Sequence, residues 1–139
     1  MSGEVDGRVD ELVVAARAMR ERAYAPYSGF LVGAALLAGG EVFAAPNIEN
    51  ASYPMSVCAE RNAVALMVAA GQRHVDAVAV VGSSEDGVTP PCGGCRQVLY
   101  EFGGPELTVV AESRAGDERA TWTLRELLPE AFGPHDLTG

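Results

Sequence analysis

The feature that most constrains this chain is the placement of its cysteines. All three lie in two short motifs, Cys58-Ala59-Glu60 and Pro91-Cys92-Gly93-Gly94-Cys95. Each motif precedes a segment with the composition of a helix. The thiols are therefore expected at helix N-termini, where the helix dipole favours thiolate over thiol. Between them the motifs offer three thiolates and one carboxylate, which is enough for a catalytic metal site.

Zinc is the metal that this set of residues favours. It prefers thiolate ligands, and three protein ligands with an open fourth position are typical of catalytic zinc. We therefore expect Cys58, Cys92 and Cys95 to bind one zinc ion. Glu60 lies two residues after Cys58, near enough to face water at the open position without binding the metal. A carboxylate there can accept a proton from that water and pass it on.

Three other interpretations compete with a catalytic zinc site. A structural zinc site needs a fourth ligand, but neither His74 nor His135 falls at the short spacing from a cysteine that such motifs use. A redox C-x-x-C motif leaves the third cysteine and Glu60 without a role. Coincidence would make Cys58 a core residue and Glu60 a solvated acid, which explains each alone but not the pair together with the second motif.

Composition favours a globular protein that acts on a small molecule. The 139 residues are 48% hydrophobic and 21% charged, which fits one domain spanning residues 1–139. The formal charge is −9 and lysine is absent, so a nucleic-acid polymer is not the expected partner. No apolar run reaches the roughly 18 residues that span a membrane. The acidic, polar start lacks the features of a signal peptide, and we expect a cytoplasmic location.

Hydrophobic periodicity predicts a chain that alternates strands with helices. One sheet covered on both faces follows from that order. The apolar strand at 76–81 is expected at its centre, and the helix at 57–70, apolar nearly all round, is expected to be buried. Gly39-Gly40 predicts a hairpin turn, 47–54 is a polar loop, and 129–139 is expected to be irregular. The predicted helices are 6–24, 57–70, 92–102 and 123–128, and the predicted strands are 30–37, 42–45, 76–81, 107–111 and a short edge strand at 120–122.

Nearly the whole chain resembles the cytidine deaminases of the small, homotetrameric, zinc-dependent type. A P-C-x-x-C segment with a further cysteine and a non-ligating Glu is characteristic of zinc deaminases. The resemblance also covers 23–28, Phe30, 32–35, 47–53, 58–61, 91–98 and 127–132. It implies a three-layer α/β/α fold with a mixed sheet of about five strands. It further implies hydrolysis of the C4–amino bond of cytidine and deoxycytidine, with release of ammonia, in pyrimidine salvage.

The resemblance assigns roles to individual residues. Glu60 is implied to be the proton shuttle, serving water, ring N3 and then the leaving amino group. Asn47 and Glu49 match a pair that holds the ribose 3′-hydroxyl. The other implied substrate contacts are Phe30 and Ala59 within one subunit, and Tyr53 and Phe132, which match groups reaching a neighbouring subunit's pocket. The family's homotetramer would then have composite active sites.

Two arginines are candidates to tune the metal. Three thiolates leave zinc with more negative charge than a His/Cys₂ set, which weakens it as a Lewis acid. Hydrogen-bond donors to the sulfurs would offset that charge. Arg61 matches the family's residue for this task, and Arg96 is a second candidate.

Two departures from the family pattern concern the choice of substrate rather than the type of reaction. Ala45-Pro46 stands where Gly-Cys is common, and Asn62 stands where Thr is common. Pro46 directly precedes Asn47 and can adjust the sugar contacts. Two alternatives are therefore kept: a deaminase of a modified cytidine or of a cytosine-nucleoside antibiotic such as blasticidin S, and a non-catalytic zinc-stabilised binding module.

Overall fold

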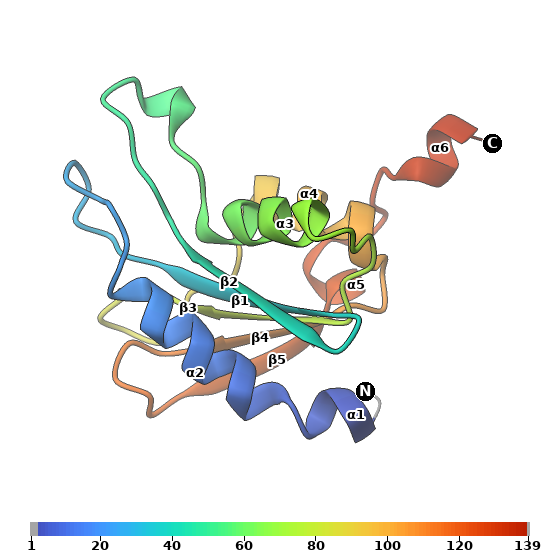
Figure 1. The fold of residues 1–139 in the computed structure, drawn as a ribbon, viewed down its shortest axis with the longest axis horizontal. Helices are drawn as coiled ribbons and strands as arrows, with labels where there is room; N and C mark the ends of the chain where they lie inside the picture. The colour runs from blue at the N-terminus through green and yellow to red at the C-terminus, as the bar shows by residue number, and fades with distance from the viewer. Residues whose placement is uncertain (1–2, 139) are drawn as a thin grey trace.

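A computed structural model describes residues 3–138 and places five strands in one mixed sheet (Figure 1). The strand order is β2-β1-β3-β4-β5, so β3 is central and β5 is an edge, as predicted. Only β3 and β4 pair in parallel, and the other neighbours are antiparallel. The strands are β1 (Gly33–Ala38), β2 (Glu41–Pro46), β3 (Ala77–Val81), β4 (Thr108–Glu112) and β5 (Arg119–Thr123).

Helices cover both faces of the sheet, which confirms the three-layer α/β/α arrangement. Helix α2 (Val9–Arg20) lies across one face, and α3 (Ala59–Ala69) and α4 (Gly93–Gly103) lie side by side on the other (Figure 1). The short helix α5 (Leu124–Leu127) begins with the predicted capping box of Thr123 and Glu126. Within residues 3–138 no helix combines the length and the apolar character needed to cross a bilayer.

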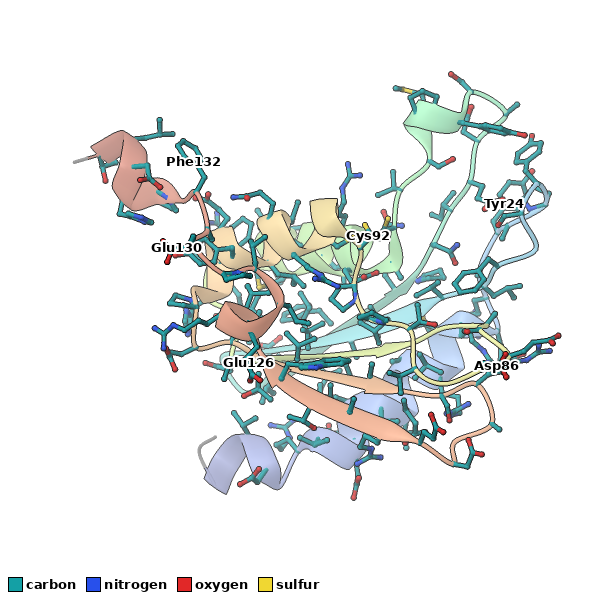
Figure 2. All side chains as sticks on the ribbon, turned by 180° about the vertical axis from the view of Figure 1, so that it is seen from behind. Tyr24, Asp86, Cys92, Glu126, Glu130 and Phe132 are labelled. Atoms are coloured by element: carbon teal, nitrogen blue, oxygen red, sulfur yellow. The ribbon has the colours of Figure 1, made fainter. Side chains whose placement is uncertain are left out.

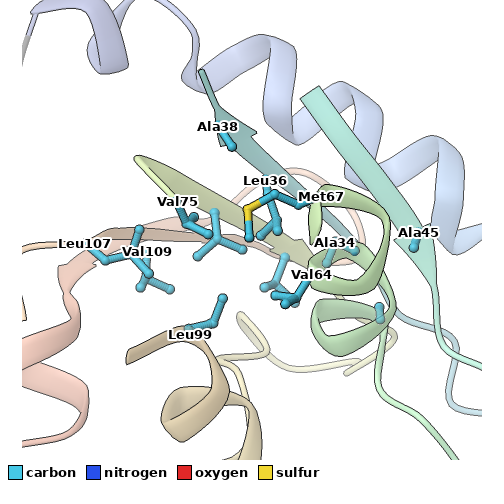
Figure 3. Close-up of a cluster of buried hydrophobic side chains, with 14 of the residues drawn as sticks. Ala34, Leu36, Ala38, Ala45, Val64, Met67, Val75, Leu99, Leu107 and Val109 are labelled. Carbon is cyan, nitrogen blue, oxygen red and sulfur yellow. The ribbon is translucent and has the colours of Figure 1, made fainter. Parts of the chain in front are cut away.

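Strand β1 illustrates how the sequence builds two cores from one sheet. Its side chains alternate between the faces, so Leu36 joins the cluster beneath α3 and α4 while Leu37 joins the cluster beneath α2. All six residues of β1 are buried. Met67 of α3 and Leu99 of α4 pack onto the first cluster (Figure 3). Helices α3 and α4 are therefore held on the centre of the sheet by apolar contacts.

Three glycines allow backbone arrangements that other residues would not. Gly39 and Gly40 have φ values of 59° and 80° and form the predicted two-residue turn between β1 and β2. At Gly33, a Cβ atom would lie 1.8 Å from the carbonyl oxygen of Ala16. Helix α2 can therefore lie this close to β1 only because residue 33 has no side chain.

Two predicted element boundaries near the pocket were wrong. The helix expected at 6–24 is a short turn, α1 (Gly3–Asp6), followed by α2, which ends at Arg20. The chain leaves the helix there because the backbone of Tyr24 bonds to Asn47 and Glu49 instead. The strand expected from Phe30 begins only at Gly33, since the backbone of 30–32 is bonded by side chains from neighbouring segments.

Two further expectations need correction. The α3 helix is not buried all round, because Ala65, Leu66, Ala69 and Ala70 are exposed. The end of the chain is not wholly irregular, since Pro134–Thr138 forms a short helix, α6, that projects away from the sheet (Figure 1). Both features leave apolar surface outside the core of this subunit: Leu66 is 49% exposed and Phe132 is 59% exposed.

Candidate active site

The three cysteines meet at the N-termini of α3 and α4. Cys58 is the N-cap of α3, Cys92 is the N-cap of α4, and Cys95 lies in the first turn of α4. Their sulfur atoms all lie within 4.8 Å of one another, and those of Cys58 and Cys92 are 3.9 Å apart. Sulfurs bound tetrahedrally to zinc at about 2.3 Å are roughly 3.8 Å apart. The cluster therefore fits a zinc ion without rearrangement of either helix.

The ionisation of the cluster also favours a cation. A hydrogen bond with Cys95 is the main cause that lowers the pKa of Cys58 to about 6, and Cys92 and the positive charge of Arg61 add to the effect. The same bond, together with burial and the negative charges of Glu60 and Cys58, raises the pKa of Cys95. The thiolate of Cys58 thus forms readily, and its negative charge opposes the ionisation of Cys95. A bound cation would offset this repulsion and favour the release of protons from the thiols.

Glu60 is a buried acid that forms no salt bridge within residues 3–138. It is 4% exposed and lies in the first turn of α3. Burial raises the pKa of Glu60 to about 7, and the negative charge of Cys58 acts in the same direction. A carboxyl group with a pKa near 7 can both accept and donate a proton at neutral pH.

A single pocket joins the cysteine cluster to the polar loop at 47–54. It encloses about 290 Å³, the size of a small-molecule site. Its lining includes Cys58, Cys92 and Glu60 together with Asn47 and Glu49. The remaining lining residues are Ser28, Phe30, Val32, Ile48, Ser56, Val57, Ala59, Val80, Thr89 and Pro90. Cys95 is fully buried behind this wall.

Asn47 is held in place by the extended segment at 30–32. Its side-chain oxygen accepts from the amide of Val32 at 2.9 Å, and its Nδ2 donates to the carbonyl of Phe30 at 3.0 Å. Because an amide nitrogen carries two hydrogens, one N–H remains for a ligand.

Glu49 is oriented by the turn that precedes this segment. Its Oε1 accepts from the amides of Tyr27 and Ser28, each at 3.1 Å, and its Oε2 accepts from the hydroxyl of Ser28. These bonds lower the pKa of Glu49, the hydroxyl of Ser28 being the largest cause. The carboxylate still has lone pairs free to accept from a ligand.

Two of the predicted substrate contacts, Tyr53 and Phe132, lie outside the pocket of their own chain. Tyr53 is 70% exposed and its ring lies 5.9 Å from that of Tyr27. Phe132 lies on the C-terminal segment before α6 (Figure 2), and its carbonyl accepts from Nε2 of Gln97 on α4 at 2.7 Å. Neither side chain lines the pocket that contains Cys58.

The two candidate arginines differ in their contacts. Arg61 is exposed, and its charge lowers the pKa of Cys58, but no hydrogen bond joins it to a sulfur within residues 3–138. Arg96 donates from Nε to the carbonyl of Pro91 and from Nη1 to that of Leu127, both at 2.8 Å. These two bonds hold the segment before Cys92 against α5, so Arg96 fixes the position of a metal ligand through the backbone.

Several pocket residues had not been singled out from the sequence. Ser28 and Thr89 belong to turns whose residues gave no periodic signal, and Val80 lies in a strand predicted only as core. The family resemblance over 23–28 is a sign in the sequence that the turn before Phe30 belongs to the site.

The chain also matches known proteins along most of its length. Residues 8–111 match the model of the cytidine and deoxycytidylate deaminase zinc-binding region. A cytidine deaminase of Sporosarcina psychrophila is 45% identical over 131 residues, which cover 94% of this chain and 95% of the relative. One of Halalkalibacterium halodurans is 47% identical over 119 residues, 85% of this chain and 89% of the relative.

A solved structure agrees with these matches. The crystal structure of cytidine deaminase from Burkholderia pseudomallei superposes with a TM-score of 0.83 and 47% identity, and the match covers 95% of this chain and 100% of that one. The buried acid, the thiol cluster and the pocket are thus found on a shared fold and a related sequence. The chain belongs to the cytidine and deoxycytidylate deaminase family.

Proposed function

We infer that this protein catalyses the zinc-dependent hydrolytic deamination of cytidine and deoxycytidine, which yields uridine or deoxyuridine and ammonia. The observation that carries this inference is the pocket itself. Its lining combines the buried Glu60 and two thiols of the cysteine cluster with Asn47 and Glu49, which we propose as the sugar contacts. We propose that residues 1–139 act as one deaminase domain in the cytoplasm.

Proton transfer falls to Glu60. Cys58, Cys92 and Cys95 would hold one zinc ion per subunit, and zinc, when bound, supplies a Lewis acid that makes water a nucleophile near neutral pH. Glu60 lines the same pocket as Cys58 and Cys92 and can accept the proton of that water. Since its pKa is near 7, it can give this proton to ring N3 and then carry a second one, from the hydroxyl added at C4, to the amino group that leaves as ammonia.

Ala59 is proposed to hold the base. It is the first residue of α3, and amides in the first turn of a helix have no partner within the helix. Ala59 lines the pocket, and its backbone N–H is proposed to donate to the base carbonyl. Phe30, a 38% exposed residue of the same lining, is proposed to flank the nucleoside.

The sugar is proposed to bind at the loop of residues 47–54, referred to below as the sugar loop. A 3′-hydroxyl can donate to Glu49 and accept from the remaining N–H of Asn47, so one hydroxyl satisfies both groups. The ionised carboxylate would repel a 3′-phosphate. This favours a nucleoside over a nucleotide chain.

A homotetramer with composite active sites is the proposed assembly. Support comes from the exposed apolar face of α3, which includes Ala65 and Leu66, and from the exposed rings of Tyr53 and Phe132. These side chains lie outside their own pocket and are available to a second copy. Light scattering should give four times the mass of one chain. A monomer with full activity would contradict the composite site.

The two alternative functions predict different results in an activity assay. A preference for a cytosine-nucleoside antibiotic would appear as a higher kcat/KM for blasticidin S than for cytidine. A binding module would hold zinc without turnover. The test is the loss of cytidine absorbance with the zinc-loaded protein, with the antibiotic run in parallel. We expect cytidine to be the better substrate, and the reverse order would overturn the assignment.

A further inference from the structure

A side chain of the metal-binding helix is bonded to the strand that leads into the sugar loop. Asn62, in the first turns of α3, donates from Nδ2 to the carbonyl oxygen of Pro46 at 2.9 Å. Pro46 ends β2 and directly precedes Asn47. We propose that Asn62 is a positioning residue that sets the sugar loop relative to the metal-binding turn, an inference that rests on the proposed sugar contacts.

The geometry of β2 explains why this carbonyl is available. Residues in an antiparallel pair alternate between bonded and non-bonded positions. The amide of Asn47 bonds to the carbonyl of Val32, so the preceding pair, Gly33 and Pro46, is non-bonded. Pro46 therefore directs its carbonyl away from β1, and proline has no N–H to pair there. Asn62 satisfies the only backbone group that Pro46 can offer.

A second contact holds the same loop from the other side of the catalytic turn. Ile48 and Val57 exchange two backbone hydrogen bonds, at 3.0 and 2.9 Å. Val57 directly precedes Cys58, whereas Asn62 lies four residues after it. The sugar loop is therefore bonded to α3 and its approach both before and after the turn that contains Cys58 and Glu60.

These two attachments fix the distance between the acid and the sugar contacts. A nucleoside in this pocket is held at C4 by one end and at the 3′-hydroxyl by the other, so a shift of the loop weakens one contact or misaligns the other. The two sites where the sequence departs from the family pattern, Pro46 and Asn62, are bonded to each other.

The test measures discrimination by the sugar contact rather than stability. Wild type, Asn62→Ala and Asn62→Thr are each assayed, as zinc-loaded enzyme, with cytidine and with 3′-deoxycytidine, which lacks only the 3′-hydroxyl. Threonine is too short to replace the amide donor. We expect both variants to lower the ratio of the two kcat/KM values roughly threefold to tenfold, mainly through a higher KM for cytidine. Zinc content should stay that of wild type.

Arg73→Ala provides a matched control at the other end of α3. Arg73 donates to the carbonyls of Val68 and Gln72, so its removal also costs side-chain-to-backbone bonds of this helix. This variant should lose stability and keep the wild-type ratio. An Asn62→Ala enzyme with the wild-type ratio of kcat/KM values, or an Arg73→Ala enzyme with a lowered ratio, refutes the positioning role of Asn62 but not the proposed sugar contact. A wild type that does not distinguish the two nucleosides refutes the proposed sugar contact, and the inference falls with it.

Discussion

Ser28 donates two hydrogen bonds to Glu49, one from its backbone amide at 3.1 Å and one from its hydroxyl. The hydroxyl of Ser28 in turn accepts from the amide of Phe30 at 3.0 Å. The proposed sugar-binding carboxylate is thereby connected to the aromatic wall of the pocket. Both groups are oriented by the protein itself, which lowers the cost of binding a nucleoside.

Removing this arrangement should weaken substrate binding more than turnover. Glu49→Gln is expected to raise KM for cytidine about tenfold. The neutral amide oxygen accepts hydrogen bonds more weakly than a carboxylate oxygen, and the NH2 group puts a donor where Glu49 has an acceptor. Ser28→Ala should raise KM for cytidine about threefold, since one of the bonds to Glu49 is lost.

The KM of the wild type should be insensitive to the ionisation of Glu49 between pH 8 and about pH 5. The lowered pKa of Glu49 keeps its carboxylate ionised throughout this range. Steady-state kinetics that show an unchanged KM in Glu49→Gln would rule out the contact.

Arg61 should affect chemistry rather than metal retention. Its charge lies close enough to Cys58 to lower the pKa of that thiol. Arg61→Ala should therefore lower kcat about tenfold or more while zinc content stays near that of wild type. Metal analysis and kcat on the same preparation distinguish the two effects. An unchanged kcat in the zinc-loaded variant would remove Arg61 from the account.

Much of the site could be predicted because its chemistry is local in sequence. Cys58 and Glu60 share one helical turn, and Cys92 and Cys95 share another, so spacing alone placed each pair. The continuous apolar run at 76–81 likewise predicted β3 as the central strand. That the two turns meet depends on α3 and α4 packing on one face of the sheet, which no local pattern encodes.

The two wrong element boundaries concern backbone groups whose partners are far away in the sequence. Tyr24 leaves the helical conformation because its backbone pairs with the sugar loop. Leu31 leaves the strand ladder because the hydroxyl of Ser83 bonds to both its amide and its carbonyl. Helical and strand periodicity continue through both positions, so the sequence carries no sign of the change.

Gly33→Ala should be strongly destabilising. The added Cβ would lie 1.8 Å from the carbonyl oxygen of Ala16, and neither α2 nor β1 can move without disturbing the core. We expect the free energy of unfolding to fall by about 3 kcal/mol or more. Gly93→Ala is the control, because a Cβ there meets nothing within 4 Å. Denaturant unfolding of the two variants should separate them, and equal stabilities would contradict the close approach.

Glu112 should make stability depend on pH. Burial alone would raise its pKa, but hydrogen bonds from Arg119 and Arg17 together lower it below the usual value of 4.5. The folded state therefore favours the ionised form. Its contribution is complete above the unfolded pKa and is lost as pH falls through the lower folded pKa. Wild type should exceed Glu112→Gln in stability by roughly 1 kcal/mol at pH 7, and less below pH 4.

Unfolding curves at a series of pH values check this prediction. A difference between wild type and Glu112→Gln that stays constant down to pH 3 would show that the ion pairs with Arg17 and Arg119 do not contribute through charge.

The central claim is that the buried Glu60 moves protons beside three zinc-binding cysteines. The most direct measurement compares wild type with Glu60→Gln for cytidine turnover and zinc content in the same preparations. We expect the variant to retain one zinc ion per subunit and to lose turnover by at least about 100-fold, because glutamine cannot accept or donate the proton. Zinc-loaded Glu60→Gln with wild-type activity would contradict the account.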